Sequence, residues 1–92
     1  MFIAIAIHHA TAEHTDEFVA FMHKVIEMTQ GAPGLLDFTA CREPTKGFLA
    51  GFSRWESAEA FRAALPTIQS LAPLRTPGWS TQPDELITLV EV

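Results

Sequence analysis

Two adjacent histidines follow the first apolar segment of the chain, and histidine is the side chain best suited to proton transfer near neutral pH. In the segment MFIAIAIHH, alternation places Ile3, Ile5 and Ile7 on one face of an expected strand. His8 continues the opposite face, so we expect it to line a pocket and to act there as a base toward a phenol-like hydroxyl. His9 points to the other face and is a second candidate for the pocket. The alternative is that both histidines only end a strand in solvent.

A tryptophan stands where a strand is expected to run directly into a helix, in the stretch GFSRWESAEAFRAAL at residues 51–65. Trp55 has two possible roles there, which do not exclude each other. Its ring either fills the core beneath the helices or forms a pocket wall on which a flat aromatic ligand stacks. A second tryptophan, Trp79, lies in the irregular segment 73–83, where it forms either a lid over the cleft or a contact across a dimer.

Composition argues against several classes of function. The 92 residues contain 6 Lys or Arg and 11 Asp or Glu, so the formal net charge is −5, and no basic cluster is present for a nucleic acid. Neither a metal-ligand spacing nor a phosphate-binding glycine loop occurs, and we expect no metal and no cofactor. The single cysteine, Cys41, permits no intrachain disulfide, which fits a reducing cytoplasm. The first apolar run is too short, and lacks the positive charge, for a signal sequence or a membrane span.

The periodicity of apolar residues divides the chain into four strands and two helices. We expect strands at residues 2–9, 35–42, 48–55 and 86–92, a helix at 16–30, and a second helix at about 57–71. The resulting β-α-β-β-α-β order predicts an α+β, ferredoxin-like fold, in which a four-stranded antiparallel sheet carries both helices on one face. All residues, 1–92, are expected to form one domain.

The other face of this expected sheet has no cover within the chain. Several strands carry apolar side chains on both faces, for example Leu35 beside Leu36 and Leu86 beside Ile87, and 48% of all residues are hydrophobic. An exposed apolar face of this size is unusual for a monomer. We therefore expect a homodimer in which the open sheet faces of two copies pack together.

Local signals mark the ends of the two helices. Either Thr11 or Thr15 is expected to cap the first helix, and Ser57 is expected to cap the second. Pro66 lies within the second helix and is expected to kink or split it near Leu65, because proline removes a backbone donor and clashes with the preceding turn.

Three stretches of the sequence resemble a known family. The segments PGLLDF at residues 33–38, GFSRWESAEAF at 51–61 and ITLVEV at the end are similar to the antibiotic biosynthesis monooxygenase (ABM-like) superfamily, whose members are dimeric α/β-barrel proteins. The resemblance covers nearly the whole chain. It implies a cofactor-independent monooxygenase that oxidises a small aromatic phenol or quinol with O₂.

The site residues implied by this resemblance are matched only in part. Members that oxidise polycyclic phenols use the tryptophan of the WES motif, an asparagine on the third strand, a tyrosine on the second helix and an arginine beyond it. Trp55 matches the tryptophan and Arg75 is the candidate arginine, a partner for an anionic intermediate. Phe61 stands at the tyrosine position, and residues 48–54 contain no asparagine. With His8 as base, the expected catalytic residues are His8, Trp55 and Arg75, and the expected pocket residues are Phe61, His9 and Trp79.

Other functions stay open at this point. Haem-degrading members share the tryptophan but need an axial histidine late in the second helix, whereas all four histidines here precede residue 24. The missing asparagine and tyrosine favour a non-catalytic homodimer that binds a small hydrophobic ligand or has a structural role. A third possibility is an isomerase or decarboxylase that uses the same base without oxygen.

Overall fold

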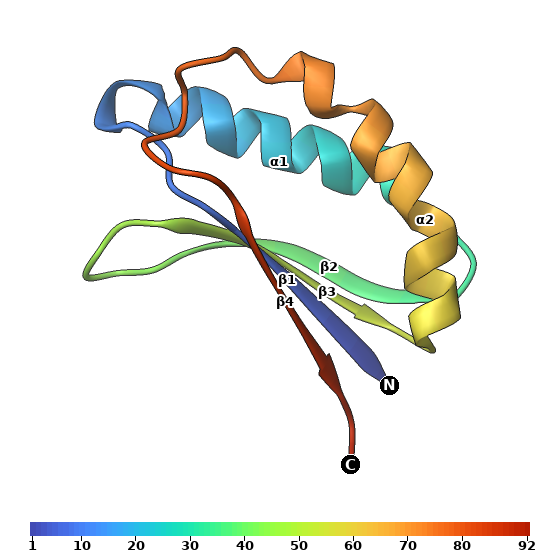
Figure 1. Cartoon of the computed structure of the whole chain (residues 1–92). Coiled ribbons are helices and arrows are strands. Elements are labelled where there is room, and N and C mark those ends of the chain that lie inside the picture. Colours follow the sequence, from blue (N-terminus) through green and yellow to red (C-terminus); the bar gives the residue numbers. More distant parts are fainter.

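Both helices lie across one face of a four-stranded antiparallel sheet in the computed structural model, which describes residues 1–92 (Figure 1). In chain order the elements are β1 (Phe2–His8), η1 (Ala12–His14), α1 (Thr15–Thr29), β2 (Leu35–Arg42), β3 (Leu49–Trp55), α2 (Ala58–Ser70), η2 (Ala72–Leu74) and β4 (Glu85–Val90). The strand order β2-β3-β1-β4 places β3 and β1 at the centre of the sheet. The expected ferredoxin-like α+β fold is confirmed. Neither helix is long and apolar enough to cross a membrane.

Small residues at the centre of the helix-side face determine where space remains under the helices. β1 pairs with β3 so that Ala4 lies opposite Ser53 and Ala6 lies opposite Gly51. Directly opposite residues of an antiparallel pair share one face, so these four residues form a floor of small side chains. A Cβ atom at Gly51 would lie 3.4 Å from the ring of Phe38, an ordinary van der Waals distance, so this ring lies directly beside the floor.

No element of the chain covers the outer face of the sheet (Figure 1), and this face carries apolar side chains. At its centre, Ile3 and Ile5 of β1 lie opposite Leu89 and Ile87 of β4. Ile87 is 43% exposed and Leu89 is 48% exposed. We call this surface the outer sheet face and define it by Ile3, Ile5, Ile7, Phe52, Ile87 and Leu89.

The core has two parts, one toward each end of the helix-side face. Near the end of β3, Trp55 is fully buried and packs edge-on against Phe61 of α2, with 5.7 Å between the ring centroids. The indole N–H of Trp55 donates a hydrogen bond of 2.9 Å to Oγ of Ser53, which satisfies its only polar atom. Toward the other end, Phe18 of α1 is fully buried and packs on Leu49.

The predicted cap is right for α2 and wrong for α1. Ser57 caps α2, because its side-chain oxygen accepts a hydrogen bond of 3.1 Å from the N–H of Ala60. Neither Thr11 nor Thr15 caps α1 with its side chain. The turn η1 leads the chain directly into the helix, so Thr15 already has helical backbone angles, and its hydroxyl donates instead to the carbonyl of Thr11 at 3.0 Å.

Of the two expected effects of Pro66, a kink or a split, the split does not occur, because α2 continues through Pro66 to Ser70. A proline inside a helix removes the hydrogen bond to the carbonyl four residues earlier, which here belongs to Arg62. Both Pro66 and Arg62 are exposed. Water can therefore hydrate the carbonyl that loses its partner, and the helix tolerates the loss.

Residues 71–84, which we call the strap, return the chain from α2 to β4 past the end of β1 (Figure 1). Two backbone hydrogen bonds of 2.7 Å fasten the strap to the residues that follow β1: the N–H of Thr11 donates to the carbonyl of Trp79, and the N–H of Thr81 donates to the carbonyl of His9. The strap thereby brings side chains from residues 75–84 to the end of β1, where His8 lies.

Candidate functional site

A cavity of about 270 Å³ lies between the helix-side face of the sheet and the two helices. Its floor consists of Ala4, Ala6 and Gly51, and Phe21 of α1 and Phe61 of α2 contribute aromatic walls. Most of the remaining lining is also hydrophobic. Pockets that bury drug-sized ligands measure roughly 300–1,000 Å³. The cavity is therefore suited to a smaller and largely apolar molecule.

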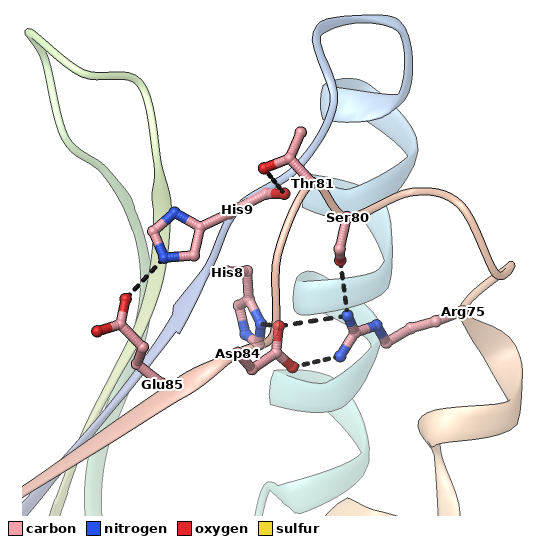
Figure 2. Close-up of polar contacts among 7 residues, drawn as sticks. All are labelled: His8, His9, Arg75, Ser80, Thr81, Asp84 and Glu85. Carbon is pink, nitrogen blue, oxygen red and sulfur yellow. Dashed lines mark hydrogen bonds and ion pairs between the residues drawn. The ribbon is translucent and has the colours of Figure 1, made fainter.

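One end of this cavity is polar, and three charged or titratable side chains meet there (Figure 2). Nδ1 of His8 lies 3.1 Å from Oδ1 of Asp84. Arg75 donates to both oxygens of the same carboxylate, from Nη1 to Oδ2 at 2.5 Å and from Nη2 to Oδ1 at 3.3 Å. Nη2 of Arg75 also donates to Oγ of Ser80 at 3.0 Å. We call His8, Asp84 and Arg75 the polar cluster.

Burial controls the ionisation of His8. Its side chain is 12% exposed, and its ring lies 4.9 Å from the ring of Phe18, measured between centroids. Burial lowers the pKa of His8 below its ordinary value of 6.5, and the nearby carboxylate of Asp84 opposes this effect only in part. The positive charge of Arg75 lowers the pKa of His8 further. His8 is therefore a neutral imidazole at neutral pH, with one ring nitrogen able to accept a proton.

Asp84 stays ionised beside this neutral imidazole. Partial burial by itself would raise the pKa of Asp84, but the hydrogen bonds from Arg75 and the nearby ring of His8 outweigh burial and hold this pKa below its ordinary value. The guanidinium of Arg75 also lies over the ring of Phe18, 4.7 Å from its centroid, which adds a cation–π contact. The charges of Arg75 and Asp84 therefore cancel, and the polar cluster carries no net charge.

The polar cluster can perform acid–base chemistry on a molecule in the cavity. Nδ1 of His8 is buried and faces Asp84, whereas Nε2 makes no hydrogen bond with the protein. The N–H direction of Nδ1 is not well aligned with the carboxylate. Catalytic hydrogen bonds often become well aligned only when a ligand binds. An imidazole backed by a carboxylate is a suitable base for a hydroxyl group with a pKa near that of a phenol.

Three of the six residues expected from the sequence line the cavity, namely His8, Phe61 and Arg75. Arg75 is not a free cation, because Asp84 already occupies its guanidinium. Trp55 lies behind Phe61 and contributes no surface to the cavity, since its ring is fully buried. Its position corresponds to the packing role rather than to a wall of this cavity.

The other two expected pocket residues lie outside the cavity lining. His9 points to the opposite side of the sheet from His8, and its Nε2 lies 2.7 Å from Oε2 of Glu85 (Figure 2). Trp79, in the strap, packs against Phe18 with 5.9 Å between ring centroids and stacks on His14 at 6.3 Å. Trp79 therefore fixes the strap to α1 rather than facing the cavity.

Sequence reasoning missed Asp84, which proves to be the central member of the polar cluster. A signal for it is present in the sequence, because an acidic doublet, Asp84 and Glu85, stands at the start of the last strand just as a histidine doublet stands at the end of the first, with one residue of each doublet outside the strand. β1 and β4 pair so that Ile7 lies opposite Glu85. One step further along the pair, His8 comes beside Asp84. No group of three His, Cys, Asp or Glu side chains is arranged to bind a metal ion.

The sequence and the fold were compared with those of known proteins. The sequence model of the family described as antibiotic biosynthesis monooxygenase matches residues 1–70. None of the curated proteins matches the sequence. The match to the family model extends from β1 to the end of α2, so it includes His8, Trp55 and Phe61 but not Arg75 or Asp84.

Several solved structures share the whole fold. An antibiotic biosynthesis monooxygenase is 19% identical, with a TM-score of 0.84 over 100% of this chain and 99% of the other. Rv0793 from Mycobacterium tuberculosis is 17% identical, with a TM-score of 0.83 over 99% of this chain and 94% of the other. MhuD, a haem degrader from the same organism with two haems bound in its active site, is 22% identical, with a TM-score of 0.77 over 100% and 99% of the two chains. At these identities the likeness concerns the fold alone.

Proposed function

Because this chain belongs to the antibiotic biosynthesis monooxygenase family, we propose that it is a monooxygenase that oxidises a small aromatic phenol or quinol with O₂ and without a bound cofactor. The observation that carries the proposal is the neutral imidazole of His8, which lines an apolar cavity and has one unpaired nitrogen. An apolar cavity of about 270 Å³ is large enough for one or two fused aromatic rings but not for a large ligand.

In the proposed reaction, the substrate itself supplies the electrons. Nε2 of His8 accepts the proton of the phenolic hydroxyl, which leaves an electron-rich phenolate in the cavity. This anion reduces O₂: one oxygen atom becomes bonded to a ring carbon, and the other leaves as water. For a phenol with a free ring position, the product is a quinone, since the hydroxyl proton and one ring hydrogen end in the water molecule. Substrate plus O₂ then equals quinone plus water.

The protein contributes a site that excludes water and side chains whose charges balance those formed in the reaction. The apolar walls exclude water from the anion, and Phe21 and Phe61 offer aromatic surface to a flat ring. When His8 is protonated, the imidazolium lies beside the carboxylate of Asp84, which stabilises it. The phenolate then faces the imidazolium of His8, while Arg75 stays paired with Asp84, so each charge in the site has a partner of opposite sign.

A haem group does not fit this site. MhuD binds two haems in its active site, but a porphyrin is larger than most drug-sized ligands, and these already need roughly 300–1,000 Å³. The cavity here measures about 270 Å³. In addition, Nδ1 of His8 faces Asp84, and no other histidine lines the cavity. We therefore include no haem in the proposed reaction.

The proposal includes a homodimer formed through the outer sheet face. Exposed Ile87 and Leu89 continue the row of isoleucines on β1, so the uncovered apolar surface spans adjacent strands. Apolar patches of this kind usually mark an interface, and a two-fold axis lets the same patch cover itself. Two sheets packed in this way would form the α/β barrel expected from the sequence.

A second function, a homodimer that binds a small hydrophobic ligand without catalysis, is favoured by one observation. Arg75 is already neutralised by Asp84 and is not a free partner for an anion. Product analysis under nitrogen separates this binding function from an isomerase or decarboxylase, because only an enzyme would change the ligand.

The proposal is tested by oxygen uptake. Metal-stripped protein is supplied with hydroquinones and naphthols, which have one and two rings, and the rates are corrected for autoxidation. We expect uptake above background that falls by about 10²–10⁴-fold in His8→Ala, the usual contribution of general acid–base catalysis. His23→Ala is the matched control, because His23 is exposed on α1 and is not among the residues that line the cavity. Uptake that is equal in His8→Ala and in the wild type would contradict the proposal.

A further inference from the structure

The two ring nitrogens of His8 have different surroundings. Nδ1 is buried, and Oδ1 of Asp84 is its polar neighbour at 3.1 Å. Nε2 is not buried and makes no hydrogen bond with the protein, and the side chain lines the cavity. A ligand hydroxyl in the cavity can therefore reach only Nε2.

The state of Asp84 decides which of the two nitrogens carries the proton. An ionised carboxylate only accepts hydrogen bonds, and the two hydrogen bonds from Arg75 keep Asp84 ionised. A lone pair on Nδ1 would point at this negative oxygen, so the proton belongs on Nδ1. We infer that Asp84 is a positioning residue, which holds the neutral imidazole of His8 with its proton on Nδ1 and its free lone pair on Nε2, facing the cavity.

Arg75 and Ser80 are the supports of this arrangement. The side chain of Asp84 is 34% exposed, so without an anchor it could turn toward solvent. The bidentate contact with Arg75 fixes the plane of the carboxylate, and Ser80 accepts a further hydrogen bond from the same guanidinium. The strap thus carries all three residues that set the orientation of a histidine on β1 (Figure 2).

No other nearby group would favour the proton of His8 on Nδ1. The charged or titratable groups that act on His8 are Asp84 from the strap, Arg75 from the strap and His9 from β1's end. The element packed against its other side, α1, contributes the uncharged ring of Phe18. Asp84 is the only carboxylate among them, and Arg75 can only donate hydrogen bonds. The catalytic consequence of this inference rests on the proposed function, whereas the position of the proton does not.

Asparagine at position 84 should reverse the proton position. Arg75 donates hydrogen bonds, so it holds the amide oxygen at the place of Oδ2, where its contact is shortest, 2.5 Å. The amide NH₂ group then takes the place of Oδ1 and faces Nδ1 of His8. Since NH₂ is a donor, Nδ1 must become the acceptor, and the proton moves to Nε2. Loss of the correct imidazole tautomer is the known effect of the same replacement in serine proteases.

The test is nuclear magnetic resonance of ¹⁵N-labelled protein without ligand, in which two-bond ¹H–¹⁵N couplings identify the protonated nitrogen of each histidine. In the wild type we expect His8 with its proton on Nδ1, at least about tenfold in excess over the other tautomer. In Asp84→Asn we expect the proton on Nε2. Glu85→Gln is the matched control, because Glu85 pairs with His9 on the other side of the sheet and should leave the His8 signals unchanged.

A wild-type His8 with its proton on Nε2 would overturn the inference, and so would an unchanged tautomer in Asp84→Asn. The wild-type spectrum alone decides the matter if the variant does not fold. Failure of the proposed function gives a different result. In that case no oxygen uptake is detected, but the proton of His8 is still found on Nδ1. If uptake is found, Asp84→Asn should lower kcat by about 10²–10⁴-fold with little change in KM for a neutral phenol, because the charge left on Arg75 acts on anions rather than on a neutral ligand.

Discussion

His8 and His9 are neighbours in the chain and pair with two neighbouring acids, yet the pairs lie on opposite sides of the sheet (Figure 2). His9 lies closer to its partner, with 2.7 Å between Nε2 and Glu85, than His8 does to Asp84, with 3.1 Å. Glu85 is 61% exposed, however. Exposed ion pairs contribute little to stability, typically about 0–1 kcal/mol. The shorter contact is thus the less consequential one.

We call His8 and Asp84 the inner pair, and His9 and Glu85 the outer pair. The two pairs have the same kinds of side chain, but the inner pair has different surroundings. His8 packs on the ring of Phe18 and lines an apolar cavity, and its partner Asp84 is anchored by Arg75. Burial and neighbouring charges separate the roles of identical residue types in many active sites. The comparison teaches that residue type and distance do not identify the functional pair, whereas the face of the sheet does.

The largest expected effect is on the stability of the homodimer that we propose to form through the outer sheet face. Ile87→Asp places one carboxylate per subunit in the proposed dimer interface, opposite the row that contains Ile5. Because an unpaired charge is costly to bury, we expect the dissociation constant of the dimer to rise at least about 100-fold, or roughly 2.7 kcal/mol. Sedimentation velocity across a concentration series measures this change.

The control for this experiment is Thr67→Asp, which adds the same charge on the exposed side of α2. It should leave the dissociation constant unchanged. A wild-type protein that sediments as a monomer at all concentrations would contradict the homodimer. A dimer that is insensitive to Ile87→Asp would mean that another surface forms the interface.

The fold was predictable because its signals are local. Alternation along 2–9 and 48–55 identified β1 and β3, and the Ser57 cap located the start of α2. The two errors concern single residues whose effect depends on their surroundings. Pro66 is tolerated because its helix face is exposed, and the threonines before α1 do not cap it because a 3-10 turn precedes the helix.

The site was predictable only in part, because it depends on contacts between distant segments. Alternation along β1 was enough to direct His8 toward the helix side, where it lines the cavity. Asp84 lies 76 positions later in the sequence, and only the β1–β4 register and the path of the strap bring it to His8. Trp55 was ambiguous for a different reason, since a strand-end tryptophan suits both a core and a pocket, and only its complete burial separates the two.

A smaller effect is expected on ligand selection at the inner pair. Asp84→Asn leaves the positive charge of Arg75 without a compensating carboxylate at the end of the cavity. We expect an aromatic carboxylate such as benzoate to bind about tenfold more tightly to this variant, from a Coulomb attraction of roughly 1–2 kcal/mol. Calorimetric titration measures the change, with a neutral phenol as the reference ligand.

The same titration with Glu85→Gln provides the comparison with the outer pair. That variant removes an equal charge from the neighbouring position, so it should not alter benzoate binding. Equal gains in the two variants would mean that net charge, rather than the uncompensated guanidinium, attracts the ligand.

The smallest expected effect is on the pH dependence of stability. Burial lowers the pKa of His8 in the folded chain below the 6.5 of the unfolded chain. Between these two pKa values only the unfolded chain binds the proton, so the free energy of unfolding is highest above pH 6.5 and falls as the pH drops from there toward the folded pKa. Asp84 acts in a lower window, because its stabilisation is lost only as the pH falls below 3.8, through its own lowered pKa. Urea denaturation at about pH 7.5 and about pH 5 measures this decline, and His8→Gln should lose less stability between the two pH values than the wild type. An equal decline in His8→Gln and in the wild type would show that protonation of His8 does not cause it.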